Sequence, residues 1–196
     1  MKNLLLLCLI LGSIPVTAQE TEPKRIKWYL PDHVKLQFAG NIGFLSGGPG
    51  YLSRNKTLET DIMFGFLPEK FGGDGLISTS LKTTYSPWSI PLKNDYYIKP
   101  FSIGAYLSYT FGTQFDLKLP EHYPIGYYWW ATSMRAGAYM GGKVGKELTR
   151  LKRKRSLEAY YELGTYDLLL ISYVQNTGYL KPSDIVNLAF GVRLGF

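Results

Sequence analysis

The last twelve residues, Ile185 to Phe196 (IVNLAFGVRLGF), alternate apolar side chains with small or polar ones and end on a phenylalanine. A period of two is typical of a β-strand whose two faces meet different surroundings. Such an apolar strand has an unpaired edge unless it pairs with the first strand and closes a barrel. The terminal stretch therefore predicts an all-β fold, a closed barrel with a membrane around its apolar face.

The N-terminal residues have the features of a secretory signal peptide. Lys2 precedes an uncharged apolar run from Leu4 to Val16, and Val16-Thr17-Ala18 has the small-x-small pattern of a cleavage site. We expect residues 1–18 to be a cleaved signal peptide, 19–32 a periplasmic leader, and 33–196 the barrel domain. Cys8, the single cysteine, lies in the expected signal peptide, so the mature chain is predicted to lack disulfides and thiolate metal sites.

Composition supports a membrane barrel. Aromatic residues make up 15% of the chain, with 16 tyrosines, and Tyr and Trp favour membrane–water interfaces. After residue 18 no segment has the ~18 uninterrupted apolar residues that a membrane helix needs. The net charge of +7 is concentrated in one basic run, so a nucleic-acid partner is not expected. The run comprises Lys143, Lys146, Arg150, Lys152, Arg153, Lys154 and Arg155.

Alternation and turn residues predict eight antiparallel strands of an eight-stranded transmembrane barrel. They are residues 34–45, 58–66, 76–85, 101–111, 127–141, 157–165, 168–176 and 185–196. Residues 168–171 are continuously apolar, so the facing of that strand is left open. An eight-stranded barrel is just wide enough to be filled by side chains, so a plugged polar interior is expected.

The connections follow from this topology if both termini are periplasmic. Residues 46–55, 86–100, 142–156 and 177–184 are then expected to be extracellular loops, and 67–75, 112–126 and 166–167 periplasmic turns. The connection at 112–126 is longer than periplasmic turns usually are, and its side is the weakest part of this topology.

Charged residues of both signs fall on the predicted inner faces: Lys35, Glu59, Asp61, Lys82, Arg135, Glu158, Glu162 and Arg193. Buried charges must be paired, so these residues predict a structural plug, with a gated or ligand-linked network as the alternative. Arg193 is expected to pair with Glu59, Asp61 or Glu162. The terminal strand is expected to pair with the strand at 34–45.

Signal peptide, alternating strands and a terminal aromatic strand together resemble the small Gram-negative outer-membrane barrels of the OmpA and OmpX type. The resemblance implies that Phe190, Val192, Leu194 and Phe196 form the signal read by the barrel-assembly machinery. The blocks FLPEKFGGDG, LSYTFG and YYELGTYDL are also similar to an uncharacterised barrel family of Gram-negative bacteria.

The expected function is structural or interactive, at the bacterial outer membrane of the cell envelope. Partners would be membrane lipid, lipopolysaccharide, or an extracellular glycan or protein; the basic run could bind lipopolysaccharide phosphates or be a solvated loop. A lipid A-modifying enzyme is the alternative and a narrow channel the third. His33 and His122, the two histidines, have no Ser and Asp at motif spacing, so no catalytic residue is predicted. No metal site or cofactor is predicted.

Overall fold

The computed structural model describes residues 29–112, 115, 131–148 and 155–196. The expected signal peptide at 1–18 and most of the expected leader lie outside the described residues. The chain divides into two units, residues 1–30 and residues 31–196, and the second unit contains the barrel. Among the described residues, no helix is both long enough and apolar enough to cross a membrane.

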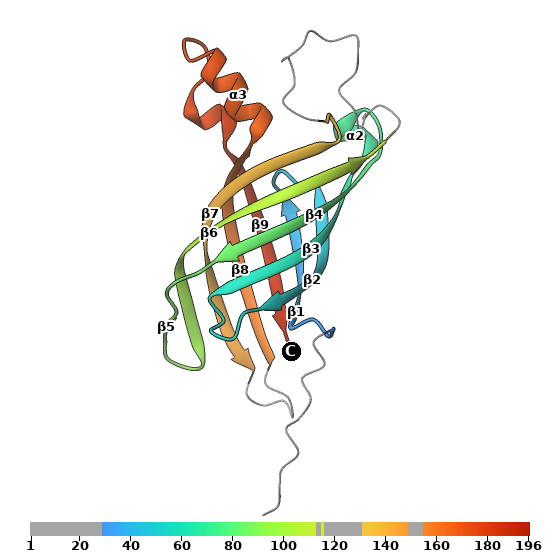
Figure 1. Ribbon diagram of the computed structural model, residues 1–196. Coiled ribbons are helices and arrows are strands. Elements are labelled where there is room, and N and C mark those ends of the chain that lie inside the picture. Colours follow the sequence, from blue (N-terminus) through green and yellow to red (C-terminus); the bar gives the residue numbers. More distant parts are fainter. Residues whose placement is uncertain (1–28, 113–114, 116–130, 149–154) are drawn as a thin grey trace, which may run out of the picture. The chain divides into compact units, whose positions relative to one another are not determined.

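Eight antiparallel strands of the described chain close into a barrel (Figure 1). They are β1 (His33–Ala39), β2 (Leu45–Leu52), β3 (Leu58–Leu67), β4 (Leu76–Tyr85), β6 (Tyr96–Phe111), β7 (Met134–Leu148), β8 (Arg155–Tyr166) and β9 (Asn187–Gly195). The two-residue strand β5 (Ile90–Pro91) extends the sheet beside β6. Three short helical segments, α2 (Glu69–Gly72), α3 (Asp167–Gln175) and the 3-10 helix η1 (Pro182–Ile185), lie between strands.

The barrel closes between its first and last strands. Every residue of β1 pairs with β9, with Val34 opposite Leu194, Lys35 opposite Arg193 and Phe38 opposite Phe190. The predicted pairing of the terminal strand with the strand at the start of the barrel domain is confirmed. Because β4 also pairs with β6, the ring leaves no open edge among these eight strands.

Side chains alternate between the interior and the outer wall. On β3, Glu59, Asp61 and Met63 are fully buried, whereas Ile62 and Phe64 are exposed on the outer face. The period of two that the sequence shows is therefore the period of the barrel wall. On β6 an irregularity between Lys99 and Ser102 shifts the register, so that both of these residues face inward although their numbers differ in parity.

One strand was predicted as a loop. Most of residues 46–55 is not a loop, because Leu45–Leu52 form β2 after a tight turn at 40–44, and the turn that follows begins only at residue 53. The glycines of β2 make room for neighbouring strands. A Cβ on Gly48 would lie 1.8 Å from the Ile62 carbonyl oxygen, and one on Gly50 would lie 2.1 Å from Asp61 Oδ1. The chain reverses earlier, where Gly40 and Gly43 have φ of +85° and +146°.

One predicted strand is a helix. Residues 168–176, expected to be the seventh strand, lie almost entirely in α3, which also replaces the tight turn expected at 166–167. Periodicity alone does not separate a short, continuously apolar strand from a helix. The total of eight strands is right because the missed β2 and the misassigned 168–176 compensate. The expected loops at 86–100 and 142–156 are shorter than predicted, since β6 begins at Tyr96 and β7 continues to Leu148.

The missed hairpin also reverses the direction of the strands between β2 and α3. The connections at 68–75, between Phe111 and Met134, and at 167–186 begin and end at the barrel end opposite the C-terminus. The connections at 86–95 and between Leu148 and Arg155 begin and end at the same end as the C-terminus. Apart from 177–184, the expected sides of these connections relative to the termini are therefore wrong.

Four interior tyrosines each lie across a glycine directly opposite on the next strand. The pairs are Tyr97 with Gly145, Tyr106 with Gly137, Tyr139 with Gly104, and Tyr160 with Gly191. A Cβ on any of these glycines would lie 2.2 to 2.3 Å from a tyrosine ring carbon. Each glycine thus leaves space that an aromatic ring fills, which packs the interior tightly.

We predict that Gly191→Ala destabilises the barrel by about 1–3 kcal/mol, because the added methyl group displaces the Tyr160 ring. The matched control is Gly178→Ala, since a Cβ at Gly178 meets nothing within 4 Å. Urea unfolding followed by tryptophan fluorescence measures both. Equal stability of the two variants would show that the Tyr160–Gly191 pair does not constrain the interior.

Candidate functional site in the barrel interior

The carboxylate of Glu59 is the centre of the interior charges. Glu59 lies on β3 and is fully buried. Its Oε2 is 2.9 Å from Lys35 Nζ and 2.7 Å from Lys143 Nζ. Its Oε1 is 3.3 Å from Arg193 NH1 and 3.4 Å from Lys99 Nζ. These four cations come from β1, β7, β9 and β6, so one carboxylate links β3 to four other strands.

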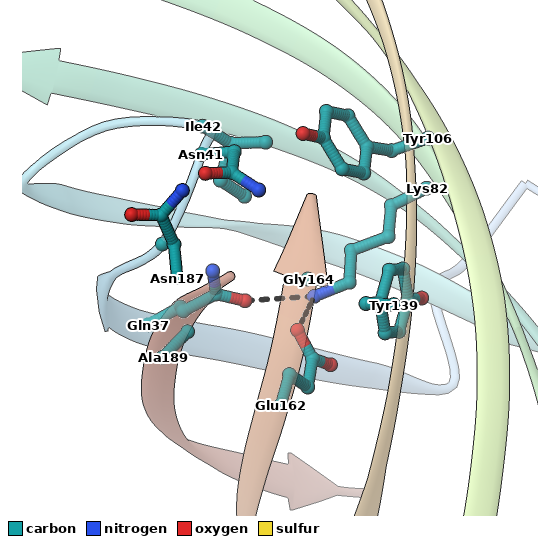
Figure 2. Close-up of a pocket in the computed structure, with 11 residues that line it drawn as sticks. Gln37, Asn41, Ile42, Lys82, Tyr106, Tyr139, Glu162, Gly164, Asn187 and Ala189 are labelled. Atoms are coloured by element: carbon teal, nitrogen blue, oxygen red, sulfur yellow. Dashed lines mark hydrogen bonds and ion pairs between the residues drawn. The ribbon is translucent and has the colours of Figure 1, made fainter. Parts of the chain in front are cut away.

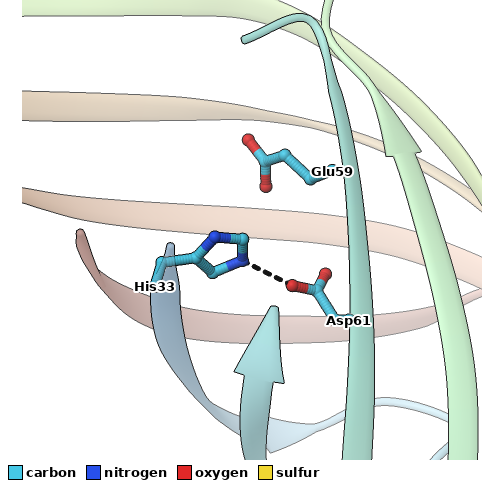
Figure 3. Close-up of side chains that lie close together, drawn as sticks. All are labelled: His33, Glu59 and Asp61. Atoms are coloured by element: carbon cyan, nitrogen blue, oxygen red, sulfur yellow. Dashed lines mark hydrogen bonds and ion pairs between the residues drawn. The ribbon is translucent and has the colours of Figure 1, made fainter. Parts of the chain in front are cut away.

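A second carboxylate lies beside it (Figure 3). Asp61 Oδ1 is 2.6 Å from His33 Nε2, and Asp61 Oδ2 accepts a hydrogen bond of 2.6 Å from Lys35 Nζ. Lys35 therefore bridges Asp61 and Glu59. His33, at the start of β1, is fully buried, and its Nδ1 has no hydrogen-bond partner among the described residues.

Glu158 on β8 joins the same group. Its Oε2 lies 3.0 Å from Arg193 Nε, and its Oε1 accepts a 2.6 Å hydrogen bond from the Tyr97 hydroxyl. Arg193 therefore bridges Glu59 and Glu158, two carboxylates on different strands. This fulfils the expectation that Arg193 pairs with Glu59, and adds a partner that was not expected.

A separate ion pair lies further along the interior (Figure 2). Lys82 Nζ donates to Glu162 Oε2 at 2.5 Å and to Gln37 Oε1 at 2.7 Å. The same ammonium lies 4.6 Å from the centre of the Tyr139 ring and 5.6 Å from that of Tyr160, within the range of cation–π attraction. Hydrogen bonds, opposite charge and aromatic faces together replace the water that Lys82 loses on burial.

A small cavity of about 20 Å³ lies next to this pair. Asn41, Asn187 and Tyr106 line it together with Lys82 and Glu162. A volume of this size holds about one water molecule. The described interior therefore has no space for a substrate or an ion pathway at this point.

The buried charges of the interior nearly balance. Among the described residues, five buried Lys and Arg side chains face four buried carboxylates. The cations are Lys35, Lys82, Lys99, Lys143 and Arg193, and the carboxylates are Glu59, Asp61, Glu158 and Glu162. Each of these groups has an opposite charge within 3.4 Å, which is the condition for tolerating charge away from water.

The structure brings together all the predicted interior residues except Arg135. Lys35, Glu59, Asp61, Lys82, Glu158, Glu162 and Arg193 are buried in the ion-paired interior. Arg135 is half-buried at the beginning of β7, and its NH1 donates to the Met134 carbonyl oxygen at 2.7 Å. Strand β7 begins later than predicted, which leaves Arg135 at the barrel end.

Three members of the buried interior group were not among the predicted interior residues. Lys143 was assigned to the basic loop, although it is an odd-numbered residue and the odd-numbered side chains of β7 face inward. His33 follows the same parity as Lys35 and was excluded only because the strand was started one residue late. Lys99 carried no signal, because it faces inward through the register shift in β6.

The remaining predicted residues lie elsewhere. Lys146 is half-buried, with its Nζ 4.5 Å from the centre of the Tyr96 ring, and Arg155 is exposed at the start of β8. The other basic-run residues, Arg150, Lys152, Arg153 and Lys154, lie outside the described residues, as does His122. Phe190, Val192, Leu194 and Phe196 are exposed on the outer wall, and their expected role in assembly stays a prediction.

His33, Glu59 and Asp61 form a buried cluster of three possible metal ligands. One donor atom from each residue lies within 4.8 Å of the others, a spacing that a metal ion could bridge. However, every carboxylate oxygen of Glu59 and Asp61 already contacts a Lys, Arg or His nitrogen. A metal ion would have to displace Lys35, so the geometry favours an ion-pair cluster.

No family model, curated protein or solved structure matches this chain. The fold and interior nevertheless define a class, a closed eight-stranded antiparallel barrel with an ion-paired interior. That architecture is consistent with barrels of the OmpX type.

We predict that Glu59→Gln destabilises the barrel by about 3–5 kcal/mol, since it leaves buried cations without their shared anion. Glu147→Gln, the same chemical change at an exposed position of β7, is the control and should be nearly neutral. Urea unfolding measures both.

In a Glu59→Gln background, Lys143→Met should lower the free energy of unfolding by less than it does in the native chain, because the carboxylate that Lys143 pairs with is already gone. Independent, additive effects would contradict the network.

We predict that neither Zn²⁺ nor a chelator changes the Tm of the native barrel, because Lys35 occupies the carboxylate oxygens a metal would need. Thermal unfolding with and without each reagent tests this. A Zn²⁺-dependent rise in Tm that disappears in His33→Ala would identify the cluster as a metal site instead.

Proposed function

We propose that this chain is an integral outer-membrane barrel with a structural or surface-interaction role and no catalytic activity. The observation that carries the proposal is the outer wall. Large apolar side chains cover it, including Leu36, Phe64, Leu81 and Val192, each about half exposed. Among the described strand positions that face outward, the charged side chains are Lys146 and Arg155, both near the barrel end that holds the C-terminus.

Aromatic side chains at both ends of the wall support a membrane setting. Tyr85, Trp88 and Tyr96 are exposed near the end that holds the C-terminus, with Phe196. Phe38, Phe66, Phe71 and Phe111 are exposed near the opposite end. Two aromatic bands flanking an apolar zone are typical of membrane barrels, where the rings lie at the two lipid–water boundaries.

The interior supports the same proposal. Soluble proteins bury apolar residues and expose charged ones, whereas this barrel buries its charges and exposes leucine, phenylalanine and valine. Lipid would cover the outer wall without a cost in hydration, and ion pairs would stabilise an interior sealed from water. Lipid outside the barrel and an interior sealed from water together account for the residue types on both faces of the wall.

The topology refines which loops would meet a partner. With the termini in the periplasm, the long connections at 112–133 and 167–186 would be extracellular, where OmpX-type barrels have their longer loops. The basic connection between Leu148 and Arg155 would then be periplasmic. Contacts with lipopolysaccharide, glycan or protein are therefore proposed for the extracellular end of the barrel, which excludes the basic run from binding outer-leaflet lipopolysaccharide.

Export and assembly belong to the same proposal. Residues 1–18 would direct the chain through the inner membrane, and the apolar side chains of β9 would be read by the barrel-assembly machinery. The alternatives receive less support. His33 and Asp61 form a pair but are fully buried, out of reach of a lipid substrate, and the cavity of about 20 Å³ does not suit a channel.

Single-cysteine variants in a Cys8→Ser background test the membrane setting. The barrel is reconstituted in vesicles of phosphatidylcholine and phosphatidylglycerol. Leu81→Cys, 53% exposed on the outer wall, should react with a lipid-soluble maleimide and resist a water-soluble one. Ser80→Cys, the inward neighbour at 3% exposed, should resist both. Reaction of Leu81→Cys with the water-soluble reagent as fast as Asn55→Cys, in an exposed turn, would overturn the proposal.

A further inference from the structure

Helix α3 follows β8 and lies past the end of the barrel that is opposite the C-terminus (Figure 1). It contacts the neighbouring strands β7 and β8 and the helix η1. None of its residues is buried. From Leu168 to Leu180 the chain has no charged side chain, and Val174 and Tyr179 are 73% and 93% exposed. An uncharged, mostly apolar stretch, interrupted by Ser172 and by Gln175 to Gly178, is therefore left exposed at this end of the barrel.

The apolar surface of α3 surrounds the helix. Leu168 and Leu170 lie about 200° apart around the helix axis, at about 100° per residue, and they are 36% and 43% exposed. A helix that docks on one protein partner usually carries a single apolar stripe. Helix α3 has exposed leucines on opposite sides, which suits an occupant that surrounds it.

The size of α3 argues against a protein occupant. Nine residues make a helix roughly 14 Å long and about 10 Å across, so one face offers far less than the ~800 Å² that each partner of a stable protein pair buries. Lipid has no such minimum, because it can cover every side of a short helix. Apolar stretches of ~10–14 residues occur in buried core helices and in interfacial or re-entrant segments, and no residue of α3 is buried.

We infer that α3 is a lipid-contacting helix, immersed in the boundary region of the bilayer that surrounds the barrel. The inference rests on the proposed function, since it requires lipid at the outer wall. The outer wall continues toward the helix: Tyr161 and Leu163 of β8 are exposed on the outer face, and β8 ends at Tyr166, one residue before α3 begins. Helical hydrogen bonds satisfy the middle of the α3 backbone, and the polar groups at its two ends would meet the hydrated boundary region and not the hydrocarbon.

Quenching by spin-labelled lipid tests the inference. A fluorescent probe is attached to single cysteines in the Cys8→Ser background, in vesicles of phosphatidylcholine and phosphatidylglycerol that contain phosphatidylcholine spin-labelled near its headgroup for the α3 probes, or deep in its acyl chains for a probe at mid-wall; Asn55→Cys is measured in both. Probes at Leu168→Cys and Leu170→Cys report opposite sides of α3. Both should be quenched about threefold or more above Asn55→Cys, the water-exposed control. A heat-dependent shift in gel mobility verifies that each variant is folded.

A probe at Leu81→Cys separates the two proposals. If Leu81→Cys is quenched while both α3 probes match Asn55→Cys, the barrel lies in lipid and the inference about α3 is wrong. If Leu81→Cys is not quenched, the proposed function fails. Quenching on one side of α3 alone, or energy transfer between two labelled copies without quenching, would indicate a protein partner or a second copy and would overturn the inference.

Discussion

The structure depends on the attraction between the Glu59 carboxylate and the four cations that surround it. A narrow eight-stranded barrel must fill its interior with side chains, and here charged ones fill it. Glu59 neutralises part of the charge that Lys35, Lys99, Lys143 and Arg193 bring into a space without bulk water. Because these residues belong to five strands, the contacts also fix how the strands are arranged around the interior. Closure, packing and occlusion of the lumen follow from the same contacts.

The outer and inner faces of the wall could be predicted from the sequence because each strand obeys a local rule. Alternation at Glu59 and Asp61, at Glu158 and Glu162, and along β9 places charges inward without knowledge of any partner. Partner choice depends on register and on long-range contacts that no local pattern encodes. Arg193 could be assigned an acidic partner, but its position between Glu59 and Glu158 follows from how β3, β8 and β9 pack across the interior.

The secondary-structure predictions were wrong where one sequence pattern fits two structures. Glycine marks chain reversals in many proteins, yet Gly48 and Gly50 lie in strand β2, where adjacent atoms leave no room for a Cβ. Short continuous apolar runs fit strands and helices equally, as α3 illustrates. Because the turn at 40–44 and strand β2 were not predicted, several connections were assigned to the wrong end of the barrel. Which connections could meet an extracellular partner therefore depended on this turn more than on the composition of the loops.

The register of the seam places Lys35 directly opposite Arg193, and both side chains point inward. Like charges opposite each other disfavour strand pairing. Three carboxylates offset this repulsion: Glu59 lies near both cations, Asp61 lies 2.6 Å from Lys35, and Glu158 lies 3.0 Å from Arg193. Closing the barrel between β1 and β9 therefore requires carboxylates that two other strands, β3 and β8, supply, so the stability of the seam depends on the correct placement of both strands.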